Sequence, residues 1–284
     1  MREILRSAVA LFEKNQISAV DAEILLAHVI GVSRKQLITS TWELLETEVD
    51  QVQDEFNILI EQRLLGKPVQ YITGSAPFRY LELSVGPGVL IPRPESEILV
   101  DRVIGFLQSS ADKEQAKSVV DLGAGSGAIA IAIATEAALK ELQVTVVAVE
   151  KSPEAAHWLN QNISKYELPT RVVVEDVTTA LDGVKADVVV ANPPYIPNHE
   201  RLPQEVIGFE PEMALRGGAG DGMDLPKIFI AAATRLLKPG GYFIMEHHET
   251  QRELVKNSML SEFKNIQSIS DLTGRDRFTS GIKS

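Results

Sequence analysis

Apolar residues in the first 66 positions recur at the three- and four-residue spacing of amphipathic helices. Ser18 followed by Asp21 resembles a capping box in front of "AEILLAHVI", which Gly31 ends. Ser33 is a suitable cap for a short third helix, and a longer apolar stripe then runs to Gly66. Because short amphipathic helices bury their apolar faces against one another, we predict a small helical bundle.

The pattern changes between Val69 and Pro94. This stretch, "VQYITGSAPFRYLELSVGPGVLIPRP", alternates aromatic and β-branched residues and is interrupted by glycine and proline. Such a texture predicts a β-hairpin that links the bundle to the rest of the chain.

Beyond the linker, helical and strand patterns alternate. The predicted helices cover residues 96–107, 127–140, 152–166 and 224–237, and the predicted strands cover 118–123, 144–150, 171–176, 186–192 and 241–247. This alternation is typical of a doubly wound α/β sheet with helices on both faces. We therefore expect three parts: helices in residues 1–73, the linker in 74–95 and the α/β domain in 96–284.

Composition narrows the class of protein. With 44% hydrophobic residues in 284, the chain can bury a substantial core, and its apolar runs are shorter than the ~20 residues of a membrane-spanning helix. The N-terminus lacks the apolar stretch of a signal peptide, and the absence of cysteine excludes disulfides and thiolate metal sites. We expect a cytoplasmic protein without a membrane partner. The net charge of -11 disfavours direct nucleic-acid binding, which usually needs a basic face.

A glycine-rich turn, "DLGAGSG", joins the first strand of the α/β part to a helix. Gly123, Gly125 and Gly127 let the backbone turn sharply and approach a ligand, while Asp121 can hold the loop or face a cationic group. The next strand ends in Glu150, roughly 20 residues further on, where a carboxylate meets the hydroxyls of a ribose. These features favour a nucleoside site. A dinucleotide enzyme stays possible from them alone, although G-x-G-x-G is not the G-x-G-x-x-G of pyrophosphate binding.

Two further strand ends carry polar groups. Asp176 closes the third strand, where it can accept a hydrogen bond from an adenine amino group. Asn192 ends the fourth, in "VVVANPPYIP", and offers a side-chain carbonyl. The prolines after it fix the backbone, so the carbonyl of Pro193 becomes a second rigid acceptor, and Tyr195 supplies an aromatic surface for a planar group. Two acceptors suit one NH2 group.

The motifs "DLGAGSGAIAIAIA" and "NPPYIP" together resemble class I S-adenosylmethionine-dependent methyltransferases that modify a planar nitrogen. The segments "EQRLLGKPVQYITGSAPF", "VLIPRPESEILV", "FEPEMALRGGAGDGMDLPKI" and "LLKPGGYFIMEH" resemble the HemK/PrmC family of peptide chain release factor glutamine methyltransferases. The resemblance implies a Rossmann-like, mostly parallel seven-stranded sheet preceded by a small helical bundle. We predict that this bundle, residues 1–73, is a substrate-docking domain, and the alternative is a folding cap. The resemblance also implies S-adenosylmethionine as cofactor, S-adenosylhomocysteine as product, and class I release factors, methylated on the glutamine of their GGQ motif, as partners.

The same resemblance assigns roles to residues. The implied cofactor residues are Asp121, Gly123, Ala124, Gly125, Ser126, Gly127, Glu150, Asp176, Val177 and Asn192. The implied substrate residues are Asn192, Pro193, Pro194 and Tyr195, with Asn192, Pro193 and Tyr195 expected to serve catalysis. The chain departs from the family at Glu150, where many relatives carry Asp, and at His248, where relatives usually have Gly.

Other interpretations of the motifs remain open at the level of sequence. An adenine-N6 DNA methyltransferase is the main alternative, since N-P-P-Y would hold an exocyclic base amine equally well. A nucleoside-binding regulator without turnover is another. His247 and His248 are adjacent on a strand and point to opposite faces, so we expect both to be structural and expect no metal site.

Overall fold

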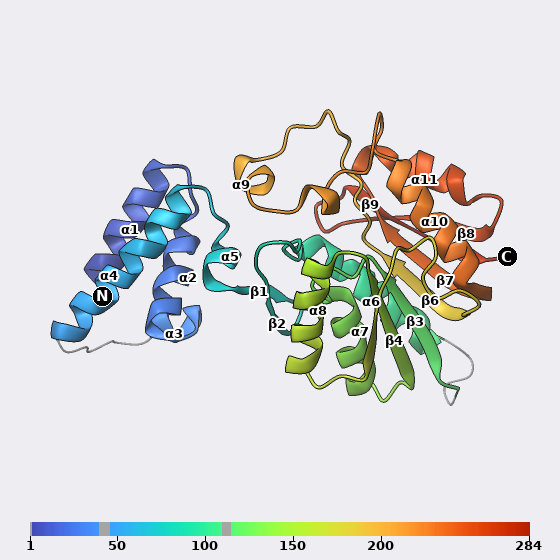
Figure 1. Ribbon diagram of the computed structural model, residues 1–284, viewed down its shortest axis with the longest axis horizontal. Coiled ribbons are helices and arrows are strands. Elements are labelled where there is room, and N and C mark those ends of the chain that lie inside the picture. Colours follow the sequence, from blue (N-terminus) through green and yellow to red (C-terminus); the bar gives the residue numbers. More distant parts are fainter. Residues whose placement is uncertain (1, 40–45, 110–114) are drawn as a thin grey trace. The chain divides into compact units, whose positions relative to one another are not determined.

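The computed structural model describes residues 2–39, 46–109 and 115–284 (Figure 1). The chain forms two compact units. We call residues up to Ser75 together with Leu202–Phe209 the helical unit, and Ala76–Arg201 with Glu210–Ser284 the sheet unit.

The helical unit confirms the predicted bundle. Its helices are α1 (Arg2–Lys14), α2 (Ala19–Ile30), α3 (Arg34–Thr39), α4 (Glu46–Leu64), α5 (Val69–Thr73) and α9 (Gln204–Ile207). The bundle is centred on Phe12, Leu25, Leu26 and Phe56, which are fully buried.

The start of α2 differs in detail from the predicted capping box. The Ser18 hydroxyl accepts a hydrogen bond from the Val20 amide, as a cap should. The Asp21 side chain instead accepts a hydrogen bond from Nε of Arg63 at 2.7 Å. Arg63 also donates to Glu205 at 2.8 Å, which ties α9 to α4 inside this unit.

The predicted hairpin is shorter than its sequence pattern suggested. Its first five residues form helix α5, which Gly74 ends in a left-handed conformation with φ of 71°. The hairpin itself consists of β1 (Ser75–Phe78) and β2 (Leu81–Ser84), and the rest of the stretch contains no strand. Gly74 supplies the positive φ that separates helix from strand, so the change of structure falls at this residue.

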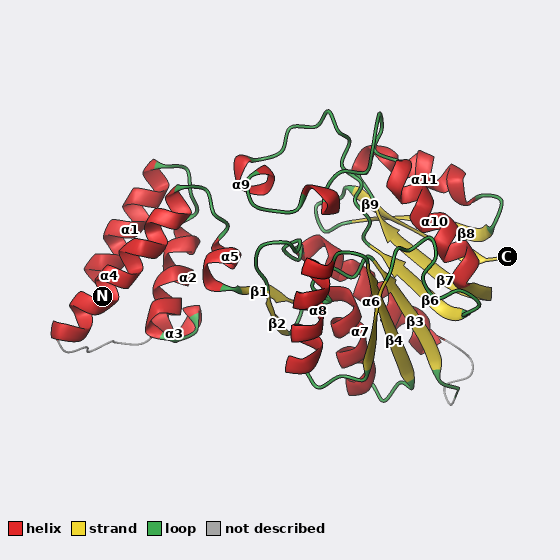
Figure 2. Cartoon of the chain, viewed as in Figure 1, coloured by secondary structure: helices red, strands yellow, loops and turns green. Residues whose placement is uncertain are grey.

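The sheet unit is a seven-stranded sheet between two layers of helices (Figure 2). Its strands are β3 (Lys117–Leu122), β4 (Val144–Glu150), β5 (Thr170–Val174), β6 (Ala186–Ala191), β7 (Leu237–Glu246), β8 (Phe263–Ser270) and β9 (Asp276–Lys283). Its helices are α6 (Glu97–Ser109), α7 (Ala128–Leu139), α8 (Pro153–Lys165), α10 (Asp224–Leu236) and α11 (Arg252–Met259), with 3-10 turns η1 (Pro94–Ser96), η2 (Glu212–Ala214) and η3 (Glu249–Gln251). The strand order is β5-β4-β3-β6-β7-β9-β8, with β3 to β7 parallel and β9 antiparallel to both its neighbours.

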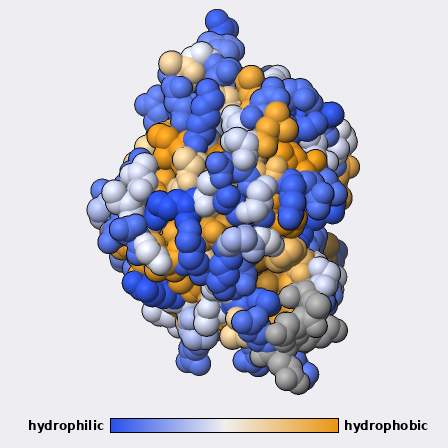
Figure 3. Space-filling model, turned by 90° about the vertical axis from the view of Figure 1, so that its right-hand side faces the viewer, coloured by the Kyte–Doolittle hydropathy of each residue, from blue (hydrophilic) through white to orange (hydrophobic). Residues whose placement is uncertain are grey.

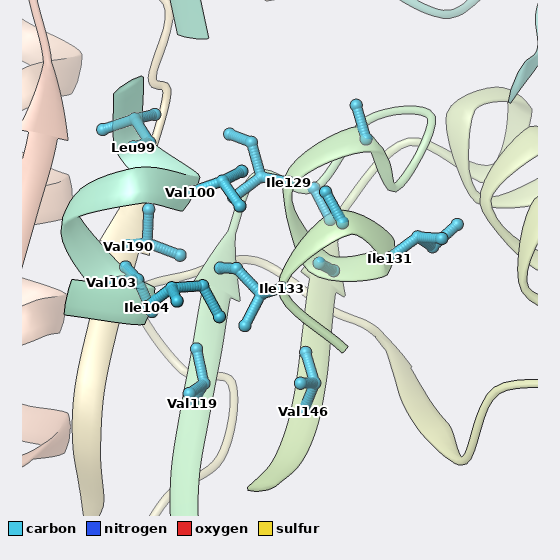
Figure 4. Packing of buried hydrophobic residues seen from close by; sticks show 14 of the residues in the cluster. Leu99, Val100, Val103, Ile104, Val119, Ile129, Ile131, Ile133, Val146 and Val190 are labelled. Carbon is cyan, nitrogen blue, oxygen red and sulfur yellow. The ribbon is translucent and has the colours of Figure 1, made fainter. Parts of the chain in front are cut away.

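Alternate side chains of the central strands enter two separate cores. Val119, Val146 and Val190 pack beneath α6 and α7 (Figure 4). Their neighbours Val120 and Val189 pack on the other face, against α10 and α11. Because both faces are covered, the middle of each of these strands is apolar on both sides, which explains the runs of valine in their sequences.

The register of the parallel strands brings the expected polar residues to one edge. Leu122 pairs with Val149 on one side and with Ala191 on the other. Gly123, Glu150 and Asn192, the next residue in each case, therefore leave three neighbouring strands at the same level. The order of strands reverses between β3 and β6, and ligands bind at such a switch point in open α/β sheets.

Among the described residues, no helix is both long and apolar enough to cross a lipid bilayer. The face drawn in Figure 3 carries hydrophilic side chains with smaller hydrophobic areas between them.

Candidate active site

A cavity of about 440 Å³ opens at the switch point of the sheet. Nine of the predicted site residues line it: Gly123, Ala124, Gly125, Ser126, Glu150, Asp176, Val177, Asn192 and Pro194. Four others, Asp121, Gly127, Pro193 and Tyr195, lie outside its lining. The volume is within the range of small-molecule sites in proteins.

The glycine-rich turn is held by backbone hydrogen bonds and leaves its middle open. The amides of Gly123 and Ala124 both donate to the Val149 carbonyl, at 2.8 and 3.0 Å. Gly125 has φ of 56°, and a Cβ placed on it would have no neighbour closer than 4.0 Å. A Cβ on Gly127, in contrast, would approach Leu159 to 2.6 Å. Gly125 thus leaves room for a ligand, while Gly127 permits close packing under the helix.

Asp121 supports the turn from below. Its Oδ2 accepts a hydrogen bond from the Ala130 amide at 3.1 Å, in the first turn of α7. Within the described structure, its Oδ1 has no hydrogen-bond partner. Complete burial, with a smaller contribution from the charge of Glu150, raises the pKa of Asp121 to about 7.

Glu150 is fixed by backbone groups at both oxygens. Its Oε1 accepts from the Ser152 amide at 2.8 Å and its Oε2 from the Gly125 amide at 2.9 Å. Each carboxylate oxygen can accept a further hydrogen bond, so the group can still bind two hydroxyls of a ligand. The sequence pattern also predicted this carboxylate at a strand end, and that placement is correct.

Asp176 lies two residues beyond the end of β5 and is largely committed to its own turn. Its Oδ1 accepts from the amide and the hydroxyl of Thr178, at 3.0 and 2.7 Å. These hydrogen bonds lower the pKa of Asp176. Its Oδ2 lies 3.9 Å from Lys151 Nζ. Its assigned hydrogen bond to an adenine amino group stays a prediction.

Asn192 lines the cavity, and one of its two side-chain N–H groups already has a partner. Nδ2 donates to the Ser96 hydroxyl at 3.0 Å, which places this side of the amide against Ser96 and directs the acceptor Oδ1 away from it. The Tyr195 hydroxyl donates to Oε1 of Glu246 at 2.8 Å. Burial, and to a lesser extent the charge of Glu246, raises the pKa of Tyr195 well above its ordinary value.

Ser96 and Glu246 belong to this site although the sequence analysis did not single them out. The Ser96 hydroxyl donates to Oε2 of Glu246 at 2.5 Å, so one carboxylate joins Ser96 and Tyr195. Glu246 ends β7 after an apolar run, just as Glu150 and Asn192 stand at the ends of their strands. That shared position was a signal in the sequence that could have identified Glu246.

Both adjacent histidines have contacts within the protein. His247 is buried, with Nδ1 2.9 Å from the His248 carbonyl oxygen and Nε2 2.9 Å from the Thr279 hydroxyl. Burial lowers the pKa of His247. His248 caps η3 and lies 3.1 Å from a carboxylate oxygen of Glu200. These contacts are consistent with structural roles.

The residues around the cavity fit the cofactor that the sequence suggested. Its walls include the apolar side chains of Phe78, Leu90, Ile129 and Phe229. The carboxylate of Glu150 and the open backbone at Gly125 provide the polar positions. A largely apolar pocket with a few placed polar groups matches a nucleoside, whose base is flat and whose ribose carries two hydroxyls.

Known proteins resemble the chain over nearly its whole length. Residues 3–74 match the PrmC N-terminal domain and residues 96–208 match the methyltransferase small domain. A release factor glutamine methyltransferase of Bifidobacterium longum is 39% identical over 91% of this chain and 90% of its own length. The enzyme of that name from Corynebacterium glutamicum is 37% identical over 99% and 98%. The chain belongs to the release factor glutamine methyltransferase family.

Solved structures agree on the fold. A 16S rRNA methyltransferase of Thermus thermophilus superposes with a TM-score of 0.52 at 21% identity, over 74% of this chain and 50% of its own. A class I methyltransferase of Listeria monocytogenes gives a TM-score of 0.51 at 14% identity, over 99% and 86%. The predicted fold class and methyltransferase class are confirmed, and the predicted cofactor, S-adenosylmethionine, agrees with them. The roles of individual site residues and the three domain boundaries stay predictions.

Proposed function

We propose that this enzyme transfers the methyl group of S-adenosylmethionine to the side-chain amide nitrogen of the glutamine in the Gly-Gly-Gln loop of class I peptide chain release factors, releasing S-adenosylhomocysteine. The release factor part of the proposal is supported by the family to which the chain belongs. The amide nitrogen is supported by the chemistry of the strand end at Asn192. The loop is supported by its two glycines, which let the chain before the glutamine extend into a narrow pocket at little steric cost.

The single observation that carries the proposal is the commitment of Asn192 Nδ2 to Ser96. This contact turns the Nδ2 side of the amide toward Ser96, so the acceptor Oδ1 is directed away from Ser96. Asn192 lines the cavity together with Glu150 and Gly125. An acceptor beside a nucleoside site suits a substrate that presents N–H groups, such as a carboxamide.

A carboxamide nitrogen is a poor nucleophile because its lone pair is delocalised into the carbonyl. S-adenosylmethionine would supply a methyl group bound to a positively charged sulfur. Asn192 Oδ1 and the Pro193 carbonyl would accept the two N–H bonds of the substrate and fix the direction of the nitrogen lone pair. Alignment of this kind contributes up to ~7–11 kcal/mol in favourable cases. We assign no general base, because the nitrogen becomes acidic once it carries the methyl group.

The proposal also covers how the release factor docks and in which compartment the enzyme acts. We assign the helical unit to docking of the release factor, since a single glutamine side chain offers little surface for selection. A release factor acts in translation, so we assign the enzyme to the cytoplasm. The net charge of -11 supports a protein substrate rather than a nucleic acid.

Peptide mass spectrometry tests the proposal directly. The purified enzyme is incubated with S-adenosylmethionine and either a release factor, the same factor with its Gly-Gly-Gln glutamine changed to alanine, or duplex DNA. We expect one added methyl group on the glutamine, lost in the alanine variant. Methylation of adenine in the DNA, or of another residue in the factor, would contradict the proposal.

A further inference from the structure

Glu246 is placed by the sheet directly beside the Asn192 strand end. Ala191 of β6 pairs with Met245 of β7, so Asn192 and Glu246 come next at the same level on neighbouring strands. Glu246 is 1% exposed, and it is not among the residues that line the cavity. It therefore affects a bound ligand only through other residues.

The hydrogen bonds around Glu246 have a fixed direction. An ionised carboxylate only accepts, so the single hydroxyl proton of Ser96 points to Glu246 Oε2. The Ser96 oxygen is then an acceptor for Asn192, which must present its Nδ2. This order determines which end of the Asn192 amide faces Ser96, and it directs Oδ1 away from Ser96.

The same carboxylate fixes the other end of the motif. Tyr195 donates its hydroxyl to Oε1 of Glu246 at 2.8 Å. The Tyr195 carbonyl in turn accepts from Gln251 Nε2 at 2.8 Å. Glu246 is thus linked directly to Tyr195 and, through Ser96, to Asn192. The side chains of the first and last residues of the Asn192–Tyr195 motif therefore depend on one carboxylate.

Burial of the Glu246 carboxylate opposes its ionisation. Burial raises the pKa of Glu246, the hydrogen bonds from Ser96 and Tyr195 oppose the rise, and Arg277 and Glu95 act on it by charge in opposite senses. A raised pKa means that the native chain holds the proton more tightly than the unfolded chain. Ionised Glu246 therefore lowers the free energy of unfolding as pH rises through that pKa.

We propose that Glu246, acting through Ser96 and Tyr195, is a positioning residue that turns the Asn192 amide so that its oxygen receives the substrate N–H. The inference rests on the proposed function, because it concerns the same amide substrate. Glu246 does not touch the reacting atoms. Its effect should appear in turnover and not in cofactor binding.

Glu246→Gln and Ser96→Ala test the two steps of the argument. A glutamine amide can accept from one of the two hydroxyls, Ser96 or Tyr195, but must donate to the other. One of the two hydrogen bonds can therefore no longer run from hydroxyl to residue 246. Ser96→Ala removes the acceptor for Asn192 Nδ2 and leaves the amide free to rotate. We expect each variant to lower kcat on the release factor by about 10- to 100-fold, the scale of one buried hydrogen bond left unsatisfied. The Kd for S-adenosylmethionine should stay within about twofold.

Stability separates positioning from a structural role. At pH 8 the Tm of Glu246→Gln should be no lower than that of the wild type, since the variant removes a buried charge. Ser96→Thr, which keeps the hydroxyl, should restore most of the turnover lost in Ser96→Ala. Glu253→Gln and Ser258→Ala, the same changes on α11, should leave kcat unchanged; Glu253 is exposed, and Ser258 donates to the Leu254 carbonyl of its own helix.

Two results would overturn the positioning role of Glu246. Wild-type kcat in Glu246→Gln and Ser96→Ala would overturn the inference, as would a loss of activity that accompanies a loss of cofactor binding and of Tm. If the wild-type enzyme itself fails to methylate the release factor, the proposed function fails first, and that result is distinct from unequal turnover among the variants.

Discussion

At the scale of single residues, two glutamates end strands of one sheet and have different surroundings. Glu150 lines the cavity and is held by two backbone amides, whereas Glu246 is buried against two hydroxyls. Both come after apolar strands, so the pattern alone could place them but could not tell a ligand-facing carboxylate from a supporting one. That distinction depends on side chains from distant segments, such as Ser96.

Asn192 should be essential for turnover and dispensable for the fold. Asn192→Ala removes one preorganised acceptor, so we expect kcat to fall roughly 10²–10³-fold, the scale for losing one preorganised hydrogen bond in an active site. Single-turnover kinetics on the release factor would measure the loss. Asn160→Ala serves as control, because Asn160 is exposed on α8 and bonds to its own helix. Near-normal turnover in Asn192→Ala would remove the residue from catalysis.

Asp121 should make the stability of the enzyme depend on pH. The native chain holds its proton up to about pH 7, whereas the ordinary value is 3.8, so the unfolding free energy falls as pH rises between these values. Asp121→Asn lacks this titration. Its free energy of unfolding, relative to that of the wild type, should therefore rise by on the order of a few kcal/mol between pH 4 and pH 8. Urea unfolding of both proteins at each pH measures the difference. The same difference in unfolding free energy between variant and wild type at pH 4 and at pH 8 would show that Asp121 does not titrate in this range.

At the scale of elements, the hydrophobic pattern alone predicted five of the seven strands and did not locate β8 and β9, whereas the family resemblance correctly implied a seven-stranded sheet. The buried parallel strands are continuous apolar runs, which are easily recognised. β8 has few buried residues and lies at the sheet edge, and β9 contains Gly281 and several polar residues. Their pairing depends on contacts between segments, which a local pattern does not contain. Helix α5 was missed because aromatic and β-branched residues there imitate a strand.

One arginine attaches the β1–β2 hairpin to α6 and α7, while hydrogen bonds with Asn162 and Tyr166 attach it to α8. Arg79, in the hairpin turn, donates to both carboxylate oxygens of Glu136 at 2.6 and 2.8 Å and lies 2.7 Å from Asp101. Its amide also donates to Glu97 at 2.8 Å. The hairpin is thereby attached to two helices that begin at the site. Helix α6 begins directly after Ser96, and helix α7 begins directly after the glycine-rich turn.

Arg79→Met should destabilise the sheet unit by about 3 kcal/mol, because it leaves the buried Glu136 carboxylate without a partner. Chemical denaturation measures the change. Adding Glu136→Leu should recover much of the loss, since the unpaired charge is then absent. Arg252→Met is the control, because Arg252 is exposed and its ion pairs should contribute less than about 1 kcal/mol. Equal losses in Arg79→Met and Arg252→Met would contradict a special role for the buried pair.

At the scale of the whole molecule, chemistry and docking are assigned to different units. Every residue that lines the cavity belongs to the sheet unit. The helical unit includes Leu202–Phe209, a segment inserted from the second half of the chain. Inside that unit, Arg63 bonds to Glu205, so the inserted segment is held by the bundle.

A chain that lacks residues 1–73 should therefore bind S-adenosylmethionine with unchanged affinity and still fail on its protein substrate. We expect kcat/KM on the intact release factor to fall by about 100-fold or more, because the contact area remote from the reacting amide is lost. On a short free peptide containing Gly-Gly-Gln, the full and truncated chains should differ little, since neither can use the docking surface. Calorimetry and methyl-transfer rates on both substrates measure the split, and circular dichroism checks the fold. A truncated chain that methylates the intact factor as fast as the full one would reduce the helical unit to a folding cap.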